Sequence, residues 1–283
     1  MIGQVVLNGV VLGASLALLS IGLTLAYGVM HIVNFAHGAV YMLGAYAVFY
    51  LSQQGLSFPE ALVLSVCAMA ALAAPLHVIL FRRVYGKFMD SLLMTIGLAL
   101  VIEGLVQLGM GAGHRTLPSY FGSVFHIFGI AITGERLVVV VASVALLAAV
   151  YVLISHTRIG LGIRAVEQDR DVADLYGVDR EAISLFVLAT SFALAAAAGG
   201  LLSPLIFIGP YIGDDAILLA FAVVILGGLG SVAGSLIAAL VLGQTLSFSE
   251  TYLSLDAGRM LFFGLVGVVL LIRPTGLLGR ALP

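Results

Sequence analysis

The chain has 283 residues and a formal net charge of −2; 62% of its residues are hydrophobic and only 9% are charged. Soluble domains carry about 25% charged residues, so a soluble fold is excluded, and the near-neutral balance gives no sign of nucleic-acid binding. The apolar runs are continuous rather than alternating, which disfavours a β-barrel and predicts an all-α, polytopic transmembrane helical bundle.

Nine apolar segments follow one another along the chain. A membrane-spanning helix needs about 20 residues, and some segments are shorter, so we expect about 8–10 spans with discontinuous helices. The pair 215–229 and 231–248 forms either two tilted spans or a broken, re-entrant pair. The segments are residues 5–27, 35–51, 60–81, 91–110, 136–155, 184–203, 215–229, 231–248 and 257–272.

Three polar residues lie around the junction of the first two segments. His31, Asn34 and His37 step by three, so a helix would place their side chains near one face. Polar groups at membrane depth need partners. We rank hydrogen bonding to a neighbouring helix first and lining of a translocation pathway second. Metal ligation ranks third, because no Cys or carboxylate is near in sequence. Asn34 and His37 are kept as pathway candidates.

A carboxylate lies near the middle of the segment 91–110. An ionised Glu103 at that depth costs roughly 3 kcal/mol, so the side chain is protonated, paired or facing a polar cavity. Thr95 precedes Glu103 by about two turns and Gln107 follows it by one, which predicts a polar stripe facing the bundle interior. Thr95 and Glu103 are therefore pathway candidates.

The longest outer connection is residues 111–135. It alternates polar and apolar residues near 124–132, which predicts a small hairpin or a cap over the outer mouth. An ordered loop without a role is the alternative.

The stretch 156–183 concentrates the charged residues of the chain and must lie in water. Residues 164–176 contain neither Gly nor Pro and show helical spacing, which predicts a short amphipathic helix. Gly177 follows directly as its expected C-cap in the left-handed conformation. The alternative is a solvated loop that happens to be helical. One face of the helix carries Val166, Ala173 and Tyr176, and another carries Glu167, Asp171 and Asp174.

Four glycines fall within eight residues of the stretch 221–235. Glycine at this density breaks a helix. Such a break either places backbone groups near a transporter's cavity or gate, or forms a tight interhelical turn on the cytoplasmic side, and the two interpretations weigh equally. Gly227, Gly228 and Gly230 are kept as pathway candidates.

The distribution of Lys and Arg predicts the orientation of the chain. With 156–183 placed in the cytoplasm, alternation of the spans puts nine of the 12 basic residues inside, and the reverse orientation inverts that ratio. We therefore expect a cytoplasmic C-terminus. The N-terminus lies outside if both early segments span fully.

Several other kinds of function find no support in the sequence. The only Gly-Lys pair, Gly86-Lys87, is followed by Phe88, so there is no P-loop and any ATP hydrolysis must come from another chain. The spacing of polar residues gives no catalytic, cofactor-binding or metal-ligating set. Cys67 is single, which excludes an intrachain disulfide, and the N-terminus reads as the start of the first span rather than a removed signal peptide.

Three motifs, in order along nearly the whole chain, resemble one family. The stretches 22–28, 32–38 and 41–45, the segment 162–179 and the glycine-rich stretch 221–234 look like signatures of the membrane permease subunits of branched-chain amino acid ABC transporters, of the LivH type. The resemblance implies the ABC importer permease fold as a single transmembrane domain over 1–283. It also implies that 156–183 is a cytoplasmic coupling segment.

The resemblance further implies an importer in a bacterial inner membrane, without cofactors of its own. Its expected partners are a second permease of the LivM type, two ATP-binding cassette ATPase subunits of the LivG and LivF type, and a periplasmic solute-binding protein. The helix at 164–176 would then dock into an ATPase groove, with Val166, Ala173 and Tyr176 inserted. The residues so assigned to coupling are Arg164, Val166, Glu167, Arg170, Asp171, Ala173, Tyr176 and Gly177.

The solute stays open at this point. Family members import branched-chain amino acids, whereas similar permeases serve urea, short amides and small carboxylates, and Glu103 stands where an uncharged polar residue is expected. The alternative function is a stand-alone secondary transporter or channel with Glu103 as its ion or proton site, which gives the charged segment 156–183 no task. A membrane-embedded enzyme has no metal set or nucleophile to support it.

Overall fold

The computed structural model describes residues 2–127 and 130–279. Every apolar segment expected from the sequence forms a helix, which confirms the all-α transmembrane bundle. The elements are α1 (Ile2–Met30), α2 (Ala36–Gln53), α3 (Phe58–Ile79), the 3-10 turn η1 (Phe81–Arg83), α4 (Phe88–Met110), β1 (Val124–Ile127), β2 (Ile130–Thr133), α5 (Gly134–His156), α6 (Arg158–Gln168), α7 (Arg170–Leu175), α8 (Arg180–Leu202), α9 (Ile212–Gly227), α10 (Val232–Tyr252) and α11 (Leu255–Ile272).

Local sequence explains where several helices begin. α3 starts with a capping box, in which the backbone N–H of Ser57 donates to Glu60 Oε2 at 2.9 Å. α8 starts after Asp179, whose carboxylate accepts hydrogen bonds from the backbone N–H groups of Glu181 and Ala182 at 3.0 and 3.1 Å. These caps satisfy N–H groups that a helix leaves unpaired at its first turn.

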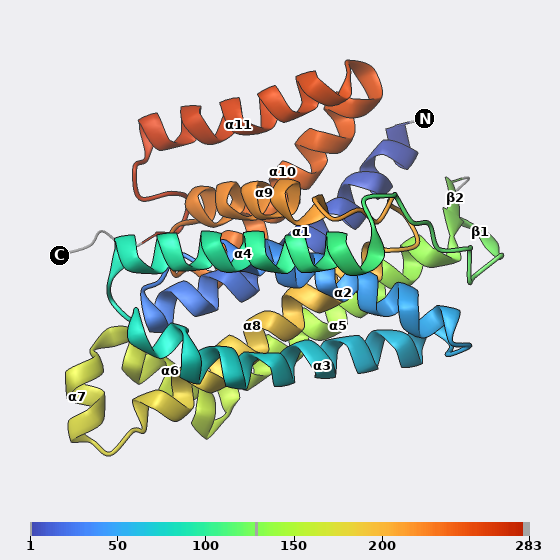
Figure 1. Ribbon diagram of the computed structural model, residues 1–283. Coiled ribbons are helices and arrows are strands. Elements are labelled where there is room, and N and C mark those ends of the chain that lie inside the picture. The colour runs from blue at the N-terminus through green and yellow to red at the C-terminus, as the bar shows by residue number, and fades with distance from the viewer. Residues whose placement is uncertain (1, 128–129, 280–283) are drawn as a thin grey trace.

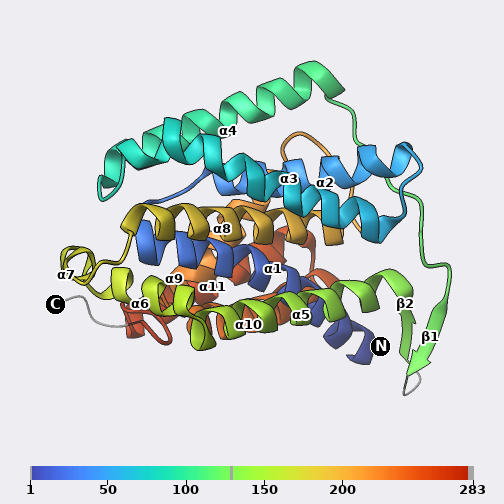
Figure 2. The same cartoon turned by 90° about the horizontal axis from the view of Figure 1, so that it is seen from below.

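α1 is the central helix of the bundle, and it lies between α8 and α10 (Figure 2). Gly13 and Gly243 bring the backbones of α1 and α10 together, since a Cβ on Gly243 would lie 2.5 Å from the backbone nitrogen of Gly13. Thr24 and Ser235 join the same helices by a hydroxyl–hydroxyl hydrogen bond of 2.8 Å. Small residues and a buried polar pair hold these helices together, as is usual where lipid removes the hydrophobic drive for association.

The charged segment and the hairpin lie at opposite ends of the bundle (Figure 1). α6 and α7 gather at one end, whereas the start of α1 lies with β1 and β2 at the other. Spans that alternate in direction require the segment 156–183 and the hairpin to lie on opposite sides of the membrane, and the two lie at opposite ends of the bundle here. Among the described helices, six are long and apolar enough to cross a membrane: α1, α3 with η1, α4, α5, α8 and α10.

The connection before α5 contains the hairpin predicted from its alternating pattern. β1 and β2 pair antiparallel, with Val124 opposite Thr133 and Phe125 opposite Ile132. Upstream of the hairpin, Arg115 and Ile208 exchange two backbone hydrogen bonds of 2.8 and 2.9 Å. The connection is thereby tied to the chain between α8 and α9.

Candidate coupling segment and translocation pathway

The chain between α1 and α2 is broken, so the helix that would align its three polar residues does not exist. Residues 31–34 have no regular structure, and His31 has a φ of 52°, the one positive value among the described non-glycine residues. A left-handed residue other than glycine costs roughly 1–2 kcal/mol, so neighbouring contacts must stabilise it. As a result, His31, Asn34 and His37 have three different surroundings.

His37 is buried, and both of its ring nitrogens have hydrogen-bond partners. Its Nε2 lies 2.9 Å from the carbonyl oxygen of Leu19 in α1, and its Nδ1 lies 3.3 Å from Ser191 Oγ in α8. The ring therefore joins the start of α2 to two central helices. For His37 this confirms the expected structural hydrogen bonding, while a place on the pathway stays a prediction.

Asn34 has surroundings of the opposite kind. Its side chain is 0% exposed, and neither Oδ1 nor Nδ2 has a hydrogen-bond partner within residues 2–127 and 130–279. A buried polar group without a partner costs roughly 1–3 kcal/mol. The amide can therefore gain from any polar group that reaches it from outside the chain, which keeps Asn34 a pathway candidate.

Thr95 fastens the break between α1 and α2 to α4. Its hydroxyl accepts a hydrogen bond from the backbone N–H of Phe35 at 3.1 Å and lies 3.0 Å from the carbonyl oxygen of Val33. Phe35 also packs on Phe221 of α9, with ring centroids 4.7 Å apart. The break thus contacts both α4 and α9.

About two turns further along α4, Glu103 meets Asp214 of α9. Glu103 is only 7% exposed, and the carboxyl group of Asp214 is its neighbour. One turn on, Gln107 Nε2 donates to Tyr211 Oη at 3.1 Å. The polar stripe predicted for α4 is therefore present in part. Thr95 and Glu103 are buried against the break before α2 and the start of α9, whereas Gln107 is exposed and does not face the bundle interior.

The sequence does not identify Asp214 and Tyr211 as the partners of this stripe. Tyr211 lies 104 residues from Gln107, and Asp214 stands beside Asp215 in what reads as an ordinary outer acidic pair. Asp215 fits that description, because its exposed carboxylate bonds Arg259 at 2.9 Å. The one available signal is the position of Asp214 in the first turn of an apolar helix, where a carboxylate is favoured.

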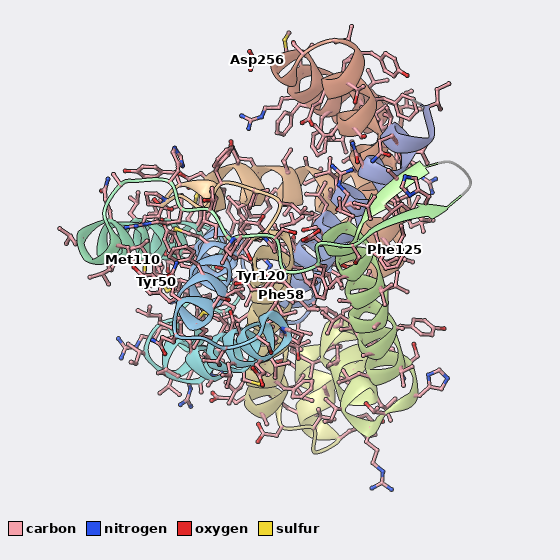
Figure 3. All side chains as sticks on the ribbon, turned by 90° about the vertical axis from the view of Figure 1, so that its right-hand side faces the viewer. Tyr50, Phe58, Met110, Tyr120, Phe125 and Asp256 are labelled. Carbon is pink, nitrogen blue, oxygen red and sulfur yellow. The ribbon has the colours of Figure 1, made fainter. Side chains whose placement is uncertain are left out.

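α4 packs loosely against α2. An open cavity of about 420 Å³ lies between parts of the two helices, and Figure 3 shows Tyr50 and Met110, which line it, close together. Its other lining residues are Leu43, Ile102, Leu105, Val106 and Gly109. Because few atoms bridge this cavity, α4 can shift relative to α2 with little loss of packing.

The glycine-rich stretch forms a tight turn between α9 and α10. Gly228 and Gly230 have φ values of 102° and 81°, which glycine adopts without strain. A Cβ on Gly227 would lie 2.5 Å from the backbone of Gly234, so the two helices meet at their glycines. The backbone N–H of Leu277, after α11, donates to the carbonyl of Leu226 at 2.7 Å and closes over the turn. The interhelical turn is confirmed, and a pathway role for Gly227, Gly228 and Gly230 stays a prediction.

The charged segment forms two helices, so the single helix expected over 164–176 is wrong. α6 ends before Asp169, whose carboxylate accepts hydrogen bonds from the N–H groups of Asp171 and Val172, both at 3.0 Å, and starts α7. An aspartate that caps a new helix competes with continuation of the old one. The expected C-cap is confirmed, since Gly177 has a φ of 78°.

Burial divides the apolar residues of this segment into two sets. Val166 and Ala173 are buried in the chain's own packing, so they are not available for the predicted insertion into a partner. Leu175 and Tyr176 are 86% and 84% exposed, and Val172 is exposed beside them. The exposed apolar residues of α7 and its C-terminal end are therefore Val172, Leu175 and Tyr176, of which only Tyr176 belonged to the predicted face.

Two of the charged residues assigned to coupling contact the preceding helix or face solvent. Arg164 donates to the carbonyl oxygen of Ile154 in α5, so it fastens α6 to the preceding helix. Asp171 is exposed on α7.

The other two reach neighbouring elements. A Cβ on Gly28 or Gly230 would lie 3.5 or 3.6 Å from Glu167 Oε1, so this carboxylate stands between the end of α1 and the glycine-rich turn. Arg170 Nη2 donates to the carbonyl oxygen of Val29 at 2.6 Å. The segment is thus in contact with the membrane helices and does not hang free of them.

Comparison with known proteins agrees with this arrangement. Residues 5–272 match the family described as branched-chain amino acid transport system / permease component. The high-affinity branched-chain amino acid transport system permease protein LivH of Escherichia coli (strain K12) is 33% identical over 98% of this chain and 95% of that protein. The permease protein BraD of Pseudomonas aeruginosa is 30% identical over the same shares. The probable LivH protein of Methanocaldococcus jannaschii is 28% identical over 98% of this chain and 92% of its own.

Among solved structures, PsaBC from Streptococcus pneumoniae in complex with Fab has a similar fold. The TM-score is 0.53 at 11% identity, with 95% of this chain and 91% of that chain covered, so the likeness concerns the fold alone. The full-length relatives and the apolar helices make this chain a multi-pass inner-membrane protein with a permease role. It belongs to the family of permease components of branched-chain amino acid transport systems.

Proposed function

We propose that the chain forms half of the translocation pathway of a bacterial ABC importer for branched-chain amino acids or a related small polar solute. ATP is hydrolysed on separate subunits, and the energy reaches this chain through the segment 156–183. The observation that carries the proposal is the exposed apolar surface of Val172, Leu175 and Tyr176.

This surface lies where apolar exposure is costly. α7 belongs to a charged segment outside the candidate membrane-spanning helices, and exposed apolar patches on water-facing elements indicate a protein partner. A groove of about 570 Å³ between α6, α7 and α8 adjoins the surface and is lined by Leu161, Val178 and Ile183 among others. An ATPase subunit bound to the patch and the groove would therefore move together with α7.

The pathway is proposed to run along the face where α4 meets α9 and the break before α2. Asn34, Thr95 and Glu103 supply polar groups there in an otherwise apolar chain. A second permease of the LivM type completes the pathway from the other side. A solute-binding protein delivers the solute at the end that carries β1 and β2, and the C-terminus lies in the cytoplasm.

A pull-down of the tagged chain from its native membrane in mild detergent, followed by mass spectrometry, tests the partner set. We expect two ATPases with P-loop motifs and a second apolar permease. The double variant Leu175→Asp/Tyr176→Asp should lose the ATPases, because two carboxylates replace the apolar contact. The matched control is Leu253→Asp, an exposed apolar residue next to α11 at the opposite end, which should retain them.

The contact between Glu103 and Asp214 favours a second candidate function, a secondary transporter or channel in which the carboxyl pair binds an ion or a proton. Liposomes that contain only this purified chain distinguish the two. Gradient-driven leucine uptake without ATPases would establish the second candidate. Uptake that requires the ATPases and ATP would establish the first.

A further inference from the structure

Arg170 links the segment 156–183 to the break between α1 and α2. Arg170, the first residue of α7, donates through Nη2 to the carbonyl oxygen of Val29 at 2.6 Å, and the same nitrogen lies 2.7 Å from His31 Nδ1. These contacts span about 140 positions of sequence (141 and 139). Arg170 therefore reaches from the proposed ATPase-contacting helix to the end of the central helix α1.

The residue that Arg170 contacts is the strained one. His31 has the left-handed backbone conformation, and its ring stacks on Tyr27 one turn earlier, with centroids 6.0 Å apart. Nearby, the backbone N–H of Gly86 donates to the carbonyl of Met30 at 3.4 Å. A conformation that costs energy persists only where such contacts hold it, so releasing Arg170 would free the break to rearrange.

The same break leads directly into the pathway face. Val33 and Phe35 bond the Thr95 hydroxyl of α4, Phe35 packs on Phe221 of α9, and the unpaired amide of Asn34 lies between them in sequence. Only the irregular residues 31–34 separate the end of α1 from Phe35. A displacement of the carbonyl of Val29 can therefore be passed to Phe35 through this short stretch. α4 can follow, because the cavity beside α2 leaves it loosely packed.

Arg164 also bonds a backbone carbonyl, but its partner Ile154 lies in the adjacent helix α5 and not at the break, and the ion-paired arginines at this end are exposed. Arg82 pairs with Glu181 at 2.7 Å and Arg180 with Asp174 at 3.6 Å, but all four side chains are 42–55% exposed, and exposed pairs contribute little. Arg170 is half-buried, so solvent screens its contact less than it screens these exposed pairs.

We propose that Arg170 is the positioning residue that transmits displacement of α7 to the break between α1 and α2, and through Thr95 to the pathway face. This inference rests on the proposed function. The guanidinium holds the break in its strained form, and ATPase movement at Leu175 and Tyr176 pulls on it. Loss of Arg170 should therefore leave ATP hydrolysis in place and disconnect it from solute movement.

The test uses the complex of this chain with the subunits that the pull-down recovers, reconstituted in proteoliposomes with radiolabelled leucine as the probe. Arg170→Ala should lower the leucine imported per ATP hydrolysed by about tenfold, the size of a typical coupling between two sites. Arg170→Lys keeps a charged donor and should restore part of the ratio. Arg180→Ala, which removes an exposed arginine from the same segment, should match wild type.

A second readout reports on the break itself and needs no solute. Val33→Cys in a Cys67→Ser background is labelled with a small maleimide, with and without ATP and vanadate. We expect nucleotide to change the labelling rate in the otherwise wild-type chain. In Arg170→Ala the rate should no longer respond to nucleotide, although the complex stays assembled.

The outcomes separate this inference from the function on which it rests. If wild-type uptake needs no ATP, the proposed function fails. If uptake is ATP-driven but Arg170→Ala keeps the wild-type ratio and nucleotide-dependent labelling, the inference alone fails. It also fails if Arg170→Ala simply releases the ATPases, because Arg170 would then be a docking residue, or if nucleotide never alters labelling at Val33.

Discussion

At the scale of the residue, buried polar groups in this chain fall into two kinds that burial alone does not distinguish. His37 has a partner on each ring nitrogen, whereas Asn34, three residues earlier, has none within the described residues. The first side chain stabilises the fold, and the second costs stability. Substitutions at the two positions should therefore have opposite effects.

His37→Leu should destabilise the protein by about 1–3 kcal/mol, because the carbonyl of Leu19 and the hydroxyl of Ser191 lose their buried partner. Thermal unfolding in detergent measures the change. His126→Leu, on the exposed strand β1, is the control and should unfold at the wild-type temperature.

Asn34→Leu should unfold at or above the wild-type temperature, since it removes a buried amide that has no partner to lose within the described chain. At the same time it should lower ATP-driven uptake, if the amide serves the solute. A drop in stability like that of His37→Leu, with unchanged uptake, would show that Asn34 is structural.

Acidification should weaken the contact between α7 and the break before α2. Burial, and then the positive charge of Arg170, lower the pKa of His31 below its ordinary value. The folded state thus favours the neutral ring, so this stability is complete above about pH 6.5 and is lost as pH falls through the lowered pKa.

The unfolding temperature measured from pH 8 to pH 5 checks this prediction. Wild type should lose stability at the acidic end relative to His31→Asn, because asparagine does not titrate and tolerates the left-handed conformation. Parallel curves for the two proteins would show that His31 does not sense pH.

At the scale of the element, the helices pack through glycines whose surroundings differ sharply. A Cβ on Gly199 of α8 would lie 2.0 Å from the carbonyl oxygen of Tyr41 in α2, whereas a Cβ on Gly97 of α4 would meet nothing within 4 Å. Both glycines are inside helices, so their intrinsic preferences are equal. Only the approach of the neighbouring backbone separates them.

Gly199→Ala should force α2 and α8 apart and cause loss of folded protein, measured as the monodisperse yield after detergent extraction. Gly97→Ala is the matched control. It should be neutral or stabilising by up to about 1 kcal/mol, since alanine favours a helix and has room here. Equal yields of the two variants would contradict the close packing of α2 on α8.

The sequence predicts these elements unevenly. Long apolar runs and the hairpin alternation are strong signals, and each produced the expected element. The break at Asp169 was missed because helical spacing continues across it, and only the capping bonds of its carboxylate interrupt the helix. The interruption between the first two apolar segments was expected, but the conformation of residues 31–34 was not, because the contacts from Arg170 and Thr95 come from distant parts of the chain.

The same holds for the site: the sequence identifies single residues, but not the partners that come from distant parts of the chain. Glu103 stands out because a carboxylate within an apolar run needs a reason, but its partner Asp214 is found only once α4 and α9 are adjacent. The resemblance to a family correctly indicated the fold and the permease role. It did not indicate which apolar residues of 164–176 face inward, because the break turns α7 so that Leu175 and Tyr176 face outward while Val166 stays buried.

At the scale of the whole molecule, the bundle has two distinct ends (Figure 1). If 156–183 is cytoplasmic, a cysteine at Leu175 and one at Ser123, before β1, lie on opposite sides of the membrane. In a Cys67→Ser background, a membrane-impermeant maleimide added to whole spheroplasts should label Ser123→Cys and spare Leu175→Cys. The reverse pattern would invert the orientation.

The central place of α1 also bears on how the chain is made. α8 and α10, which enclose α1, leave the ribosome long after it. The carbonyl of Val5 finds its partner Ser247 at a separation of 242 residues, and Thr24 finds Ser235 at 211. Until then, the hydroxyls of α1 lie in lipid or against the insertion machinery. Biogenesis thus includes a long stage in which α1 lacks α8 and α10 as neighbours, and we expect membrane quality-control proteases to act on the chain at that stage.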